Sequence, residues 1–557
     1  MKESHEGFFN YTRNEVKNCL IAQPQKISQA TELLRNYILT YNKIYTIRSD
    51  EKTEIWIYDN GIYIPQGQSH IRQTCRKILD KAYSNAIANR VIAKIAVDTY
   101  IDQNDFFKNE PPHLIPVQNG IFDFKKKELL PFSSEYYFFN KLPIIYDKSK
   151  DCPNIKKFFN EILSSEEDLE VVQELFGYVI YREYKIEKAI MFLGSGRNGK
   201  GKLCDLLKRF VGAENCANIP LQNFENDNFA MSELHNKLVN LSADISKTAL
   251  TQTGNFKSLT GRDLISASRK FLSKIHFVNY AKMIFSANEL PITNDITPAF
   301  FLRWVILNFS FQFVTKKDFT GDDITKLADP ERIEKIISND EMSGLFNFAV
   351  NGLERLLQKG DFSYSKSTSE VKKIWLRKSS SIQAFIMDCV EKKHDAITTK
   401  SEFRQSYNEY CNKHKITPIS DKLIRETLAT SCGITDGRKT VGEEQVVRCW
   451  IGILLKNEEK NDRIVSFDMV SHPMGEKGGN KIDTKNLSNL SNVSGKKSIV
   501  STDKVFEKIT LKNCEETYHK CQDCGKFPCH WQAPDGSYRC NDCSTDTATF
   551  VSEEVVE

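Results

Sequence analysis

The sequence contains no run of eighteen apolar residues, which is the length a helix needs to cross the hydrocarbon core of a bilayer. The amino-terminal segment MKESHEGFFNYTRNE also lacks the apolar core of a secretory signal. Fifteen cysteines are present, but nine of them are scattered singly over the first 449 residues, unlike a disulfide framework. We therefore expect a cytoplasmic protein of a reducing compartment, with no membrane partner.

A strong net charge is also lacking, since 77 basic and 73 acidic residues leave a formal charge of +4. Any surface for nucleic acid must therefore be a local patch. The amino-terminal region lacks two closely spaced aspartates on a strand, which a polymerase or primase needs to hold two metal ions. Asp102 and Asp105 lie three residues apart, but the polar segment IDQND around them indicates a loop. This absence argues against primase activity.

The length of 557 residues predicts three or four domains. Residues 1–110 form an α+β region, in which the helical pattern ISQATELLRNYILTY precedes an alternating hairpin around Asn60-Gly61. Residues 111–185 give short strands with a turn at Asn119-Gly120 and then two helices, the second with a Ser164-x-x-Glu167 capping signal. An α/β domain is expected over residues 186–365, where the candidate site lies.

An apolar run, a glycine-rich turn and an amphipathic run follow one another in KAIMFLGSGRNGKGKLCDLLKRFV, which is the order strand, loop, helix. Gly194, Gly199 and Lys200 match G-x-x-x-x-G-K, in which backbone N–H groups surround a phosphate and the lysine meets its outer oxygens. The positive end of the helix dipole adds to this attraction. The residues expected to bind ATP are Gly194, Ser195, Gly196, Arg197, Asn198, Gly199, Lys200 and Gly201. Gly201 replaces the usual hydroxyl ligand of Mg²⁺, so the sequence leaves that ligand open.

Polar side chains end two later apolar strands. KLVNLSAD ends on Asp244, where a carboxylate beside a phosphate loop would hold Mg²⁺; an ordinary strand-terminating aspartate is the alternative. No second acid adjoins it, so the general base is not identified. AKMIFSANELP ends its strand on Asn288, a polar side chain placed to sense a γ-phosphate or an attacking water. Arg303 directly precedes another apolar run, which puts its guanidinium at an edge.

Residues 257–285 are the densest basic stretch near this site, with six basic residues and one acidic residue. At its centre, Arg269, Lys270 and Lys274 surround the aromatic ring of Phe271. Cations beside an aromatic ring suit a loop that grips the phosphates and bases of a single strand. A solvated basic face is the alternative.

Five motifs follow one another in the order and spacing typical of superfamily 3 helicases, namely GSGRNGKGK, LVNLSAD, LTGRD with its basic hairpin, IFSANELP and FFLRW. Over residues 114–360 the chain resembles this family, and most closely the phage, plasmid and poxvirus-type primase-helicases. Gly201 and the single acid at Asp244 depart from the family pattern.

The resemblance implies an AAA+-like P-loop core that works as an ATP-driven ring, usually a hexamer. It implies that Arg303 reaches the neighbouring subunit's nucleotide as an arginine finger, and that Asn288 is the sensor. It also implies that the hairpin of Arg269, Lys270 and Lys274 faces DNA in the central channel. The residues assigned to catalysis are Lys200, Asp244, Asn288 and Arg303.

Two smaller domains are expected behind this core. Residues 380–456 follow the pattern of three helices and then strands, which resembles a winged helix. DNA recognition and a structural or partner-docking role are both open for it. Residues 457–512 are rich in Asn, Ser, Lys and Gly, which predicts a flexible linker.

Residues 513–550 carry two Cys-x-x-Cys pairs separated by fifteen residues, the spacing of a zinc ribbon in which two knuckles close a tetrahedron. The expected Zn²⁺ ligands are Cys521, Cys524, Cys540 and Cys543. Cys529 and His530 lie between the pairs, and either could replace one ligand.

The leading hypothesis is an α/β ATP-hydrolysing DNA helicase that translocates on single-stranded DNA in replication of a virus, plasmid or integrated element. Its expected partners are single-stranded DNA, further copies of the chain, and a primase or polymerase; its cofactors are ATP, Mg²⁺ and Zn²⁺. The alternative is a DNA-binding replication initiator that uses nucleotide only to assemble. The ordered sensor and finger positions favour the motor.

Overall fold

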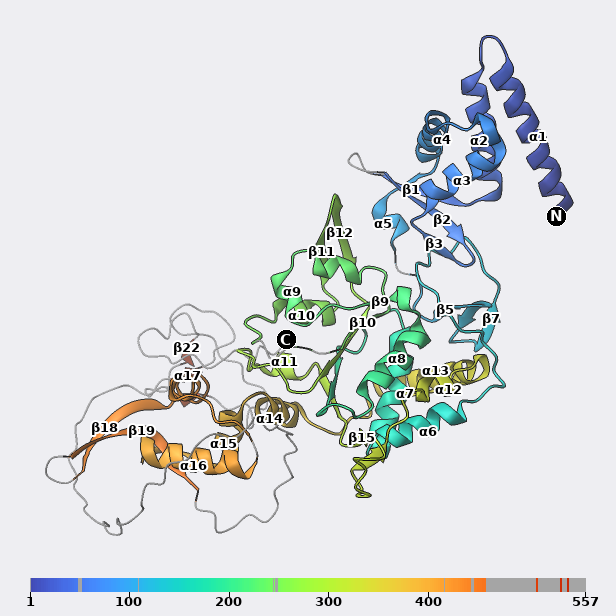
Figure 1. Cartoon of the computed structure of the whole chain (residues 1–557). Coiled ribbons are helices and arrows are strands. Elements are labelled where there is room, and N and C mark those ends of the chain that lie inside the picture. Colours follow the sequence, from blue (N-terminus) through green and yellow to red (C-terminus); the bar gives the residue numbers. More distant parts are fainter. Residues whose placement is uncertain are drawn as a thin grey trace. The chain divides into compact units, whose positions relative to one another are not determined.

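A computed structural model describes residues 2–48, 53–108, 110–243, 245, 249–414, 416–441 and 445–456, together with three two-residue strands near the carboxyl end (Figure 1). The chain divides into two units, residues 1–473 and 474–557, which are described separately. Among the described helices, none is both long enough and apolar enough to cross a membrane.

The amino-terminal region packs helices against a small sheet. Its helices are α1 Lys2–Ile21, α2 Ile27–Tyr41, α3 Gly67–Leu79, α4 Asn85–Asp98 and α5 Gln103–Phe106. The sheet has the order β3-β2-β1-β4, with β1 Ile44–Ile47, β2 Glu54–Asp59, β3 Ile62–Ile64 and β4 Tyr100–Ile101. The expected turn is confirmed, because Asn60 and Gly61 have φ of 47° and 99°, which suit a two-residue hairpin. Leu34, Ile71 and Val91 lie in the region's own core.

Three short strands and two helices lead into the main sheet. They are β5 Leu114–Val117, β6 Gly120–Asp123, β7 Glu128–Leu130, α6 Pro153–Ile162 and α7 Glu166–Ile180. Val117 pairs with Gly120, so the turn lies one residue earlier than predicted. The predicted cap of α7 is also one residue off: Ser165, in extended backbone, accepts the Asp168 amide proton at 3.1 Å. Glu167 instead accepts a hydrogen bond from the Ser365 amide.

The central element is a parallel sheet with the order β14-β8-β13-β10-β9. Its strands are β8 Ala189–Leu193, β9 Cys216–Ala217, β10 Val239–Ser242, β13 Lys282–Ala287 and β14 Trp304–Asn308. Strands β8 and β13 are buried along their whole length, as expected for a parallel sheet covered on both faces. Because all the strands point the same way, their carboxyl ends share one edge, and the glycine loop begins there.

Helices and short elements surround this sheet. They are α8 Lys200–Val211, η2 Ala213–Asn215, α9 Asn223–Asn226, η3 Ala230–Leu234, α10 Gly254–Thr260, α11 Pro298–Phe301, α12 Arg332–Ile336 and α13 Asn339–Lys359. Two small pairs accompany them: the antiparallel β11 Leu264–Arg269 with β12 Leu272–Val278, and the parallel β15 Gln312–Val314 with β16 Thr325–Leu327. The long helix predicted over residues 341–359 is confirmed in α13, which packs along α7.

The following domain contains one strand that the sequence pattern did not predict. Helix α14 Thr368–Ser379 precedes this domain and packs on the main core through Val371 and Trp375. The elements of the domain are α15 Ser381–Cys389, β17 Val390–Thr399, α16 Lys400–Lys413, α17 Asp421–Cys432, β18 Thr435–Val441 and β19 Gln445–Leu455. The sheet order is β17-β19-β18, antiparallel throughout. The unpredicted strand β17 carries the charged stretch EKKHD, and its pairing is irregular between Lys392 and Ile397. Both features hide the alternation that identifies a strand.

In the second unit the structure describes β20 Glu507–Lys508, β21 Trp531–Gln532 and β22 Tyr538–Arg539, which form an antiparallel sheet. Strand β20 falls inside the predicted linker of residues 457–512, so pairing begins before residue 513. The four predicted zinc ligands lie outside the described residues. Among the residues that the structure does describe, no group of three or more His, Cys, Asp or Glu could hold a metal ion.

Candidate nucleotide site and nucleic-acid hairpin

The glycine loop turns sharply between β8 and α8. Gly196, Arg197 and Gly199 have φ of 97°, 48° and 91°, all in the left-handed region that glycine adopts most readily. Gly199 is the N-cap of α8, and a Cβ there would lie 2.6 Å from Cγ2 of Ile162. A Cβ on Gly194 would lie 2.7 Å from the Phe309 carbonyl oxygen. Close approach and φ angle therefore explain why glycine stands at both ends of the motif.

Lys200 is the first residue of α8, and the residue is 5% exposed. Its ammonium group donates hydrogen bonds to the Gly194 carbonyl oxygen at 2.5 Å and to Oδ1 of Asn198 at 3.2 Å. It also donates to Oδ1 of Asn288, again at 3.2 Å. The structure thus brings together two residues that the sequence assigned to one site from 88 positions apart. The ammonium crosses the loop from the helix to the end of a neighbouring strand.

Asn198 supports the shape of the loop. It is buried at 2% exposure, and its Nδ2 donates to the Phe309 carbonyl oxygen at 3.3 Å. The Phe313 amide donates to the Arg197 carbonyl oxygen at 2.6 Å. These contacts tie the loop to the segment that follows β14. Ser195 and Arg197, by contrast, are exposed. The loop is thus held by its contacts with Phe309 and Phe313, while Ser195 and Arg197 face solvent.

The structure bears on the missing hydroxyl ligand of Mg²⁺ at Gly201. A Cβ built on Gly201 would have no heavy atom within 4 Å, and the residue is exposed. Crowding therefore does not explain the missing hydroxyl. The predicted carboxylate, Asp244, lies outside the described residues. The adjacent strand β10 is described, and the Ile245 amide donates to the Ser286 carbonyl oxygen at 3.0 Å, which holds this segment beside β13.

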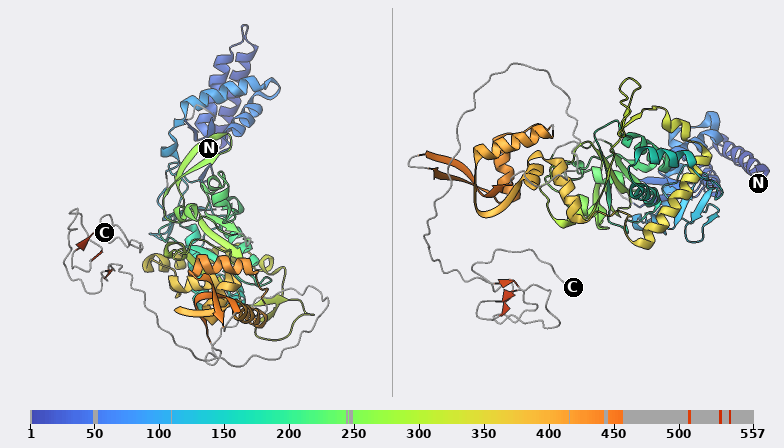
Figure 2. Two further views of the ribbon diagram at one scale, coloured as in Figure 1. Left: turned by 90° about the vertical axis from the view of Figure 1, so that its left-hand side faces the viewer. Right: turned by 90° about the horizontal axis from the view of Figure 1, so that it is seen from below.

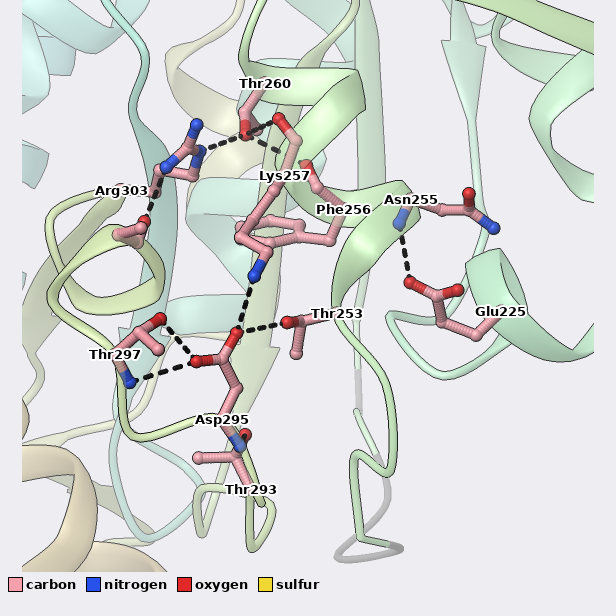
Figure 3. Close-up of polar contacts among 11 residues, drawn as sticks. Glu225, Thr253, Asn255, Phe256, Lys257, Thr260, Thr293, Asp295, Thr297 and Arg303 are labelled. Atoms are coloured by element: carbon pink, nitrogen blue, oxygen red, sulfur yellow. Dashed lines mark hydrogen bonds and ion pairs between the residues drawn. The ribbon is translucent and has the colours of Figure 1, made fainter. Parts of the chain in front are cut away.

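Arg303 lies at the other edge of the sheet, directly before β14 (Figure 3). Its carbonyl oxygen accepts from the Ala189 amide, at the start of β8. Since β8 has five residues at about 3.3 Å each, Arg303 is about 17 Å from the glycine loop of its own chain. The guanidinium donates to Oγ1 of Thr260 at 2.9 Å and to the Ala299 carbonyl oxygen at 2.5 Å, and it pairs with Glu187 at 3.4 Å. The side chain is 14% exposed.

Asp295 organises the same region, and the sequence reading did not single it out (Figure 3). Its carboxylate accepts hydrogen bonds from the side chains of Thr253, Lys257 and Thr297. Burial raises the pKa of Asp295, but these hydrogen bonds outweigh it and lower the pKa to about 2. The alternation of Thr293, Asp295 and Thr297 is the signal that could have identified it, because such side chains bond nearby backbone in turns.

Helix α10 therefore has an anchored partner at each end. Asp295 binds Lys257 and the N-cap residue Thr253, while Thr260 in the last turn receives the Arg303 hydrogen bond. The chain then continues into β11. The helix physically joins the loop after β13 to the base of the basic hairpin.

The basic hairpin is the pair β11 and β12, which projects from the core as a twisted ribbon (Figures 1 and 2). Its turn is Lys270-Phe271, and Phe271 is 81% exposed with φ of 61°. A bulky residue seldom adopts this backbone conformation. Lys270 lies over the Phe271 ring at 5.3 Å, and Lys274 is exposed on β12. The tip thus presents cations and one aromatic face to solvent.

Arg269 differs from the other two predicted cations. Its guanidinium pairs with both carboxylate oxygens of Glu54, at 3.2 and 3.0 Å, and its Nε donates to the Ser273 carbonyl oxygen. The two charged side chains are 15% and 16% exposed. Glu54, at the start of β2, was not expected from the sequence, because 215 positions separate it from Arg269.

Comparison with known proteins gives two family matches. Residues 31–164 match a family described as D5 N terminal like, and residues 192–298 match a family of unknown function, DUF5906. The second match contains the glycine loop, Asn288 and the basic hairpin. The first spans much of the amino-terminal region and the segment leading to β8.

One curated relative is "Putative helicase L207/L206" of Acanthamoeba polyphaga mimivirus, 24% identical over 260 residues. The matched part covers 44% of this chain and 26% of that protein, so the chain spans about a quarter of the relative's length. Among solved structures, two of the NrS-1 C-terminal region are similar, with TM-scores of 0.39 and 0.38 at 13% and 14% identity. Each match covers 75% of the present chain and 98% of the NrS-1 chain.

Proposed function

We propose that the chain is a superfamily 3 type DNA helicase, which hydrolyses ATP to translocate on single-stranded DNA during replication of a virus, plasmid or integrated element. The observation that carries this proposal is Lys200, which lies inside a glycine loop at the carboxyl edge of a parallel sheet and contacts Asn288. The D5 N-terminal-like match and the similarity to a helicase-named viral protein support the class.

In this proposal the β- and γ-phosphates of ATP replace the loop oxygens around Lys200. The ammonium then moves from the Gly194 carbonyl to phosphate oxygens that carry full negative charge, which makes stronger hydrogen bonds. The Asn288 amide, released from the lysine, would orient the γ-phosphate or the attacking water. The backbone N–H groups of the loop and of the α8 amino end provide the remaining donors.

Mg²⁺ would accompany the nucleotide and neutralise charge on its phosphates. Asp244 is the proposed protein carboxylate, and water would take the place of the hydroxyl that Gly201 lacks. The substitution Gly201→Ser tests this assignment of the Mg²⁺ ligands. There is space for a Cβ at this position, so the serine adds the hydroxyl without a close contact. We expect this change to tighten Mg²⁺-dependent binding of a fluorescent ATP analogue and to leave binding in EDTA unchanged.

The proposal extends to a ring, usually a hexamer, and the separation of about 17 Å between Arg303 and the glycine loop of its own chain supports this step. Its position at the amino edge of β14 suits a contact with a neighbouring copy. The winged-helix assignment of residues 380–456 is part of the same proposal, and the strand order β17-β19-β18 behind two helices supports it. A zinc ribbon held by Cys521, Cys524, Cys540 and Cys543 completes it.

A second candidate is a DNA-binding initiator that uses nucleotide only to assemble. One observation favours it: the Arg303 guanidinium already has three partners within its own chain, on Thr260, Ala299 and Glu187. A finger held in this way suits a switch that is released at assembly.

ATP hydrolysis measured with and without single-stranded DNA separates the two candidates. A motor couples hydrolysis to movement, so the strand should strongly stimulate turnover. Unchanged turnover, with DNA binding verified in the same buffer, would support the initiator.

A further inference from the structure

Arg269 and Glu54 form an ion pair between the hairpin and the amino-terminal region. Both guanidinium Nη atoms face both carboxylate oxygens, at 3.0 and 3.2 Å, in the two-pronged arrangement that arginine also makes with a phosphate. Glu54 and Arg269 are each about five-sixths buried, so water competes weakly for either group. The Glu54 carboxylate therefore fills the guanidinium fork that would otherwise be free to bind a phosphate.

The arginine is held on the hairpin side independently of Glu54. Its Nε donates across the strand pair to the Ser273 carbonyl oxygen at 3.0 Å, which fixes the plane of the guanidinium. The charge-bearing fork therefore keeps its direction when the carboxylate leaves. An exchange of carboxylate for phosphate requires movement of Glu54 or of the whole hairpin, and no new rotamer of Arg269.

A second contact joins the same two regions without charge. The ring of Phe107, just after α5, meets His235 edge-on at 4.8 Å, and His235 meets Phe277 of β12 at 5.2 Å. Burial, with a smaller contribution from the Arg269 charge, lowers the pKa of His235 to about 3, so the imidazole is neutral at physiological pH. The base of the hairpin is thus packed by apolar contact, and the ion pair is the charged contact near its tip.

The tip itself has a different character from Arg269. Phe271 and Lys274 are exposed, whereas Arg269 lies one residue before the turn and is mostly covered. A single strand that reaches the tip therefore meets Lys270, Phe271 and Lys274 first. The third predicted cation becomes available only when its carboxylate partner is displaced.

We propose that Glu54 is an internal stand-in for a DNA phosphate: it holds Arg269 until a single strand bound at the hairpin tip displaces it. The amino-terminal region then acts as a latch on the hairpin, and strand binding opens the latch. This inference rests on the proposed function, since it takes the hairpin as the surface for single-stranded nucleic acid. It adds to that function the claim that Glu54 opposes the binding of single-stranded DNA. It also adds that Arg269 must exchange the Glu54 carboxylate for a DNA phosphate.

The test is the affinity of the full-length chain for a fluorescent oligothymidylate, measured by anisotropy across a salt series. Glu54→Gln removes the competing charge and keeps the side-chain size. We expect binding to tighten about fivefold, since a charge-assisted bond no longer has to be broken. In Arg269→Ala the salt slope should fall by about 0.7, the loss of one single-strand phosphate contact. Glu54→Gln combined with Arg269→Ala should show no tightening relative to Arg269→Ala alone.

If the Glu54–Arg269 ion pair only positions the hairpin, Glu54→Gln should weaken DNA binding, because the hairpin would lose a contact that holds it in place. Weaker or unchanged binding of a Glu54→Gln protein with parental melting temperature would overturn the latch. If that variant is destabilised, Glu54→Asp keeps the charge and shortens its reach; it should tighten binding to a smaller degree, and no change would overturn the latch. Failure of the proposed function looks different, since neither the parent nor any variant would bind the oligonucleotide.

Discussion

The two edges of the parallel sheet hold their key cations differently. At the carboxyl edge, Lys200 is buried in a loop whose backbone is shaped around it, and it contacts Asn288 on the neighbouring strand. At the amino edge, Arg303 contacts Thr260, Ala299 and Glu187. In the proposed function, Lys200 would contact the nucleotide of its own chain. Arg303, on the opposite edge, would contact the nucleotide of another copy.

This difference predicts that Lys200→Ala abolishes ATP turnover and leaves the fold intact, because it removes the charge that, in the proposed function, would face the outer phosphates of ATP. Turnover should fall to background in a coupled phosphate-release assay, with a melting temperature close to that of the parent. Lys202→Ala is the matched control, since Lys202 is two residues away and bonds the Pro330 carbonyl oxygen instead. Parental turnover in the Lys200 variant would show that the loop does not hold a nucleotide.

Arg303→Ala should lower turnover by on the order of 10³-fold, the scale on which arginine fingers act. ATP binding to the isolated chain should stay near the parental value, because the arginine lies away from its own loop. Arg209→Ala is the matched control, a half-exposed arginine that pairs with Glu334. Arg303→Lys keeps the charge without the planar fork and separates catalysis from folding. A change in ATP affinity equal to the change in turnover would place the arginine at its own site.

Replacing Lys270 and Lys274 by Ala should weaken single-strand binding about tenfold at low salt. It should also reduce the salt slope by about 1.4, because two phosphate contacts each contribute about 0.7 on single strands. ATP hydrolysis without DNA should remain. The control removes the same charge elsewhere, through Lys316→Ala with Lys317→Ala between β15 and β16. If both pairs change the slope equally, the hairpin is an ordinary solvated face.

Asp295→Asn tests the cluster that joins the two edges through α10. We expect a loss of about 1–3 kcal/mol in the free energy of unfolding at pH 7, since three side-chain donors lose a charged acceptor. The folded pKa is about 2 and an unfolded aspartate titrates near 3.9, so the stabilisation is complete above about pH 4. It should disappear as the pH falls towards 2. Urea titrations at several pH values measure this difference.

The control for this cluster is Asp263→Asn, an exposed aspartate just before β11. Its effect on stability should be within about 0.5 kcal/mol at every pH. An equal loss in both variants would assign the effect to charge in general and not to the cluster.

The smallest effect on ATPase activity is expected from removing the residues after Lys456. A chain that ends after Lys456 should keep its ATPase activity and ring assembly, while metal analysis should change from one zinc per chain to none. Four thiolates bind Zn²⁺ with an apparent free energy of about 10 kcal/mol or more, so a small ribbon should unfold without it. Cys521→Ser should lose the zinc and Cys529→Ser should keep it. The reverse pattern would identify a different ligand set.

Short sequence patterns were enough to predict the glycine loop and several of the helices. The glycine loop could be predicted because its steric demands fall within six consecutive residues, Gly194 to Gly199, and because a buried strand reads as an apolar run. The helical pattern of apolar residues likewise predicted α2, which begins and ends where expected. Helix α7 was also found, but its cap was misplaced, since Ser164 and Ser165 look alike in sequence and only the backbone angles distinguish them.

Long-range pairing could not be predicted in this way. Nothing near Arg269 signals that its partner is Glu54, because the two meet through the packing of separate regions. Arg303 could be placed at an edge from the run that follows it, but its contact with Thr260 could not. Strand β17 was missed because its charged residues match no simple period. A single sequence therefore predicted which residues form the candidate site, but it did not predict the contacts that restrain their side chains.

Mixing two inactive variants tests the central claim most directly. Lys200→Ala protein offers an intact Arg303 beside a dead loop, and Arg303→Ala protein offers an intact loop without a finger. If the finger acts between copies, mixed rings contain some complete sites and regain part of the ATPase activity, with a maximum near equal proportions. No recovery at any ratio would contradict the account, provided that mass photometry confirms the rings and that a tag on one variant co-purifies the other.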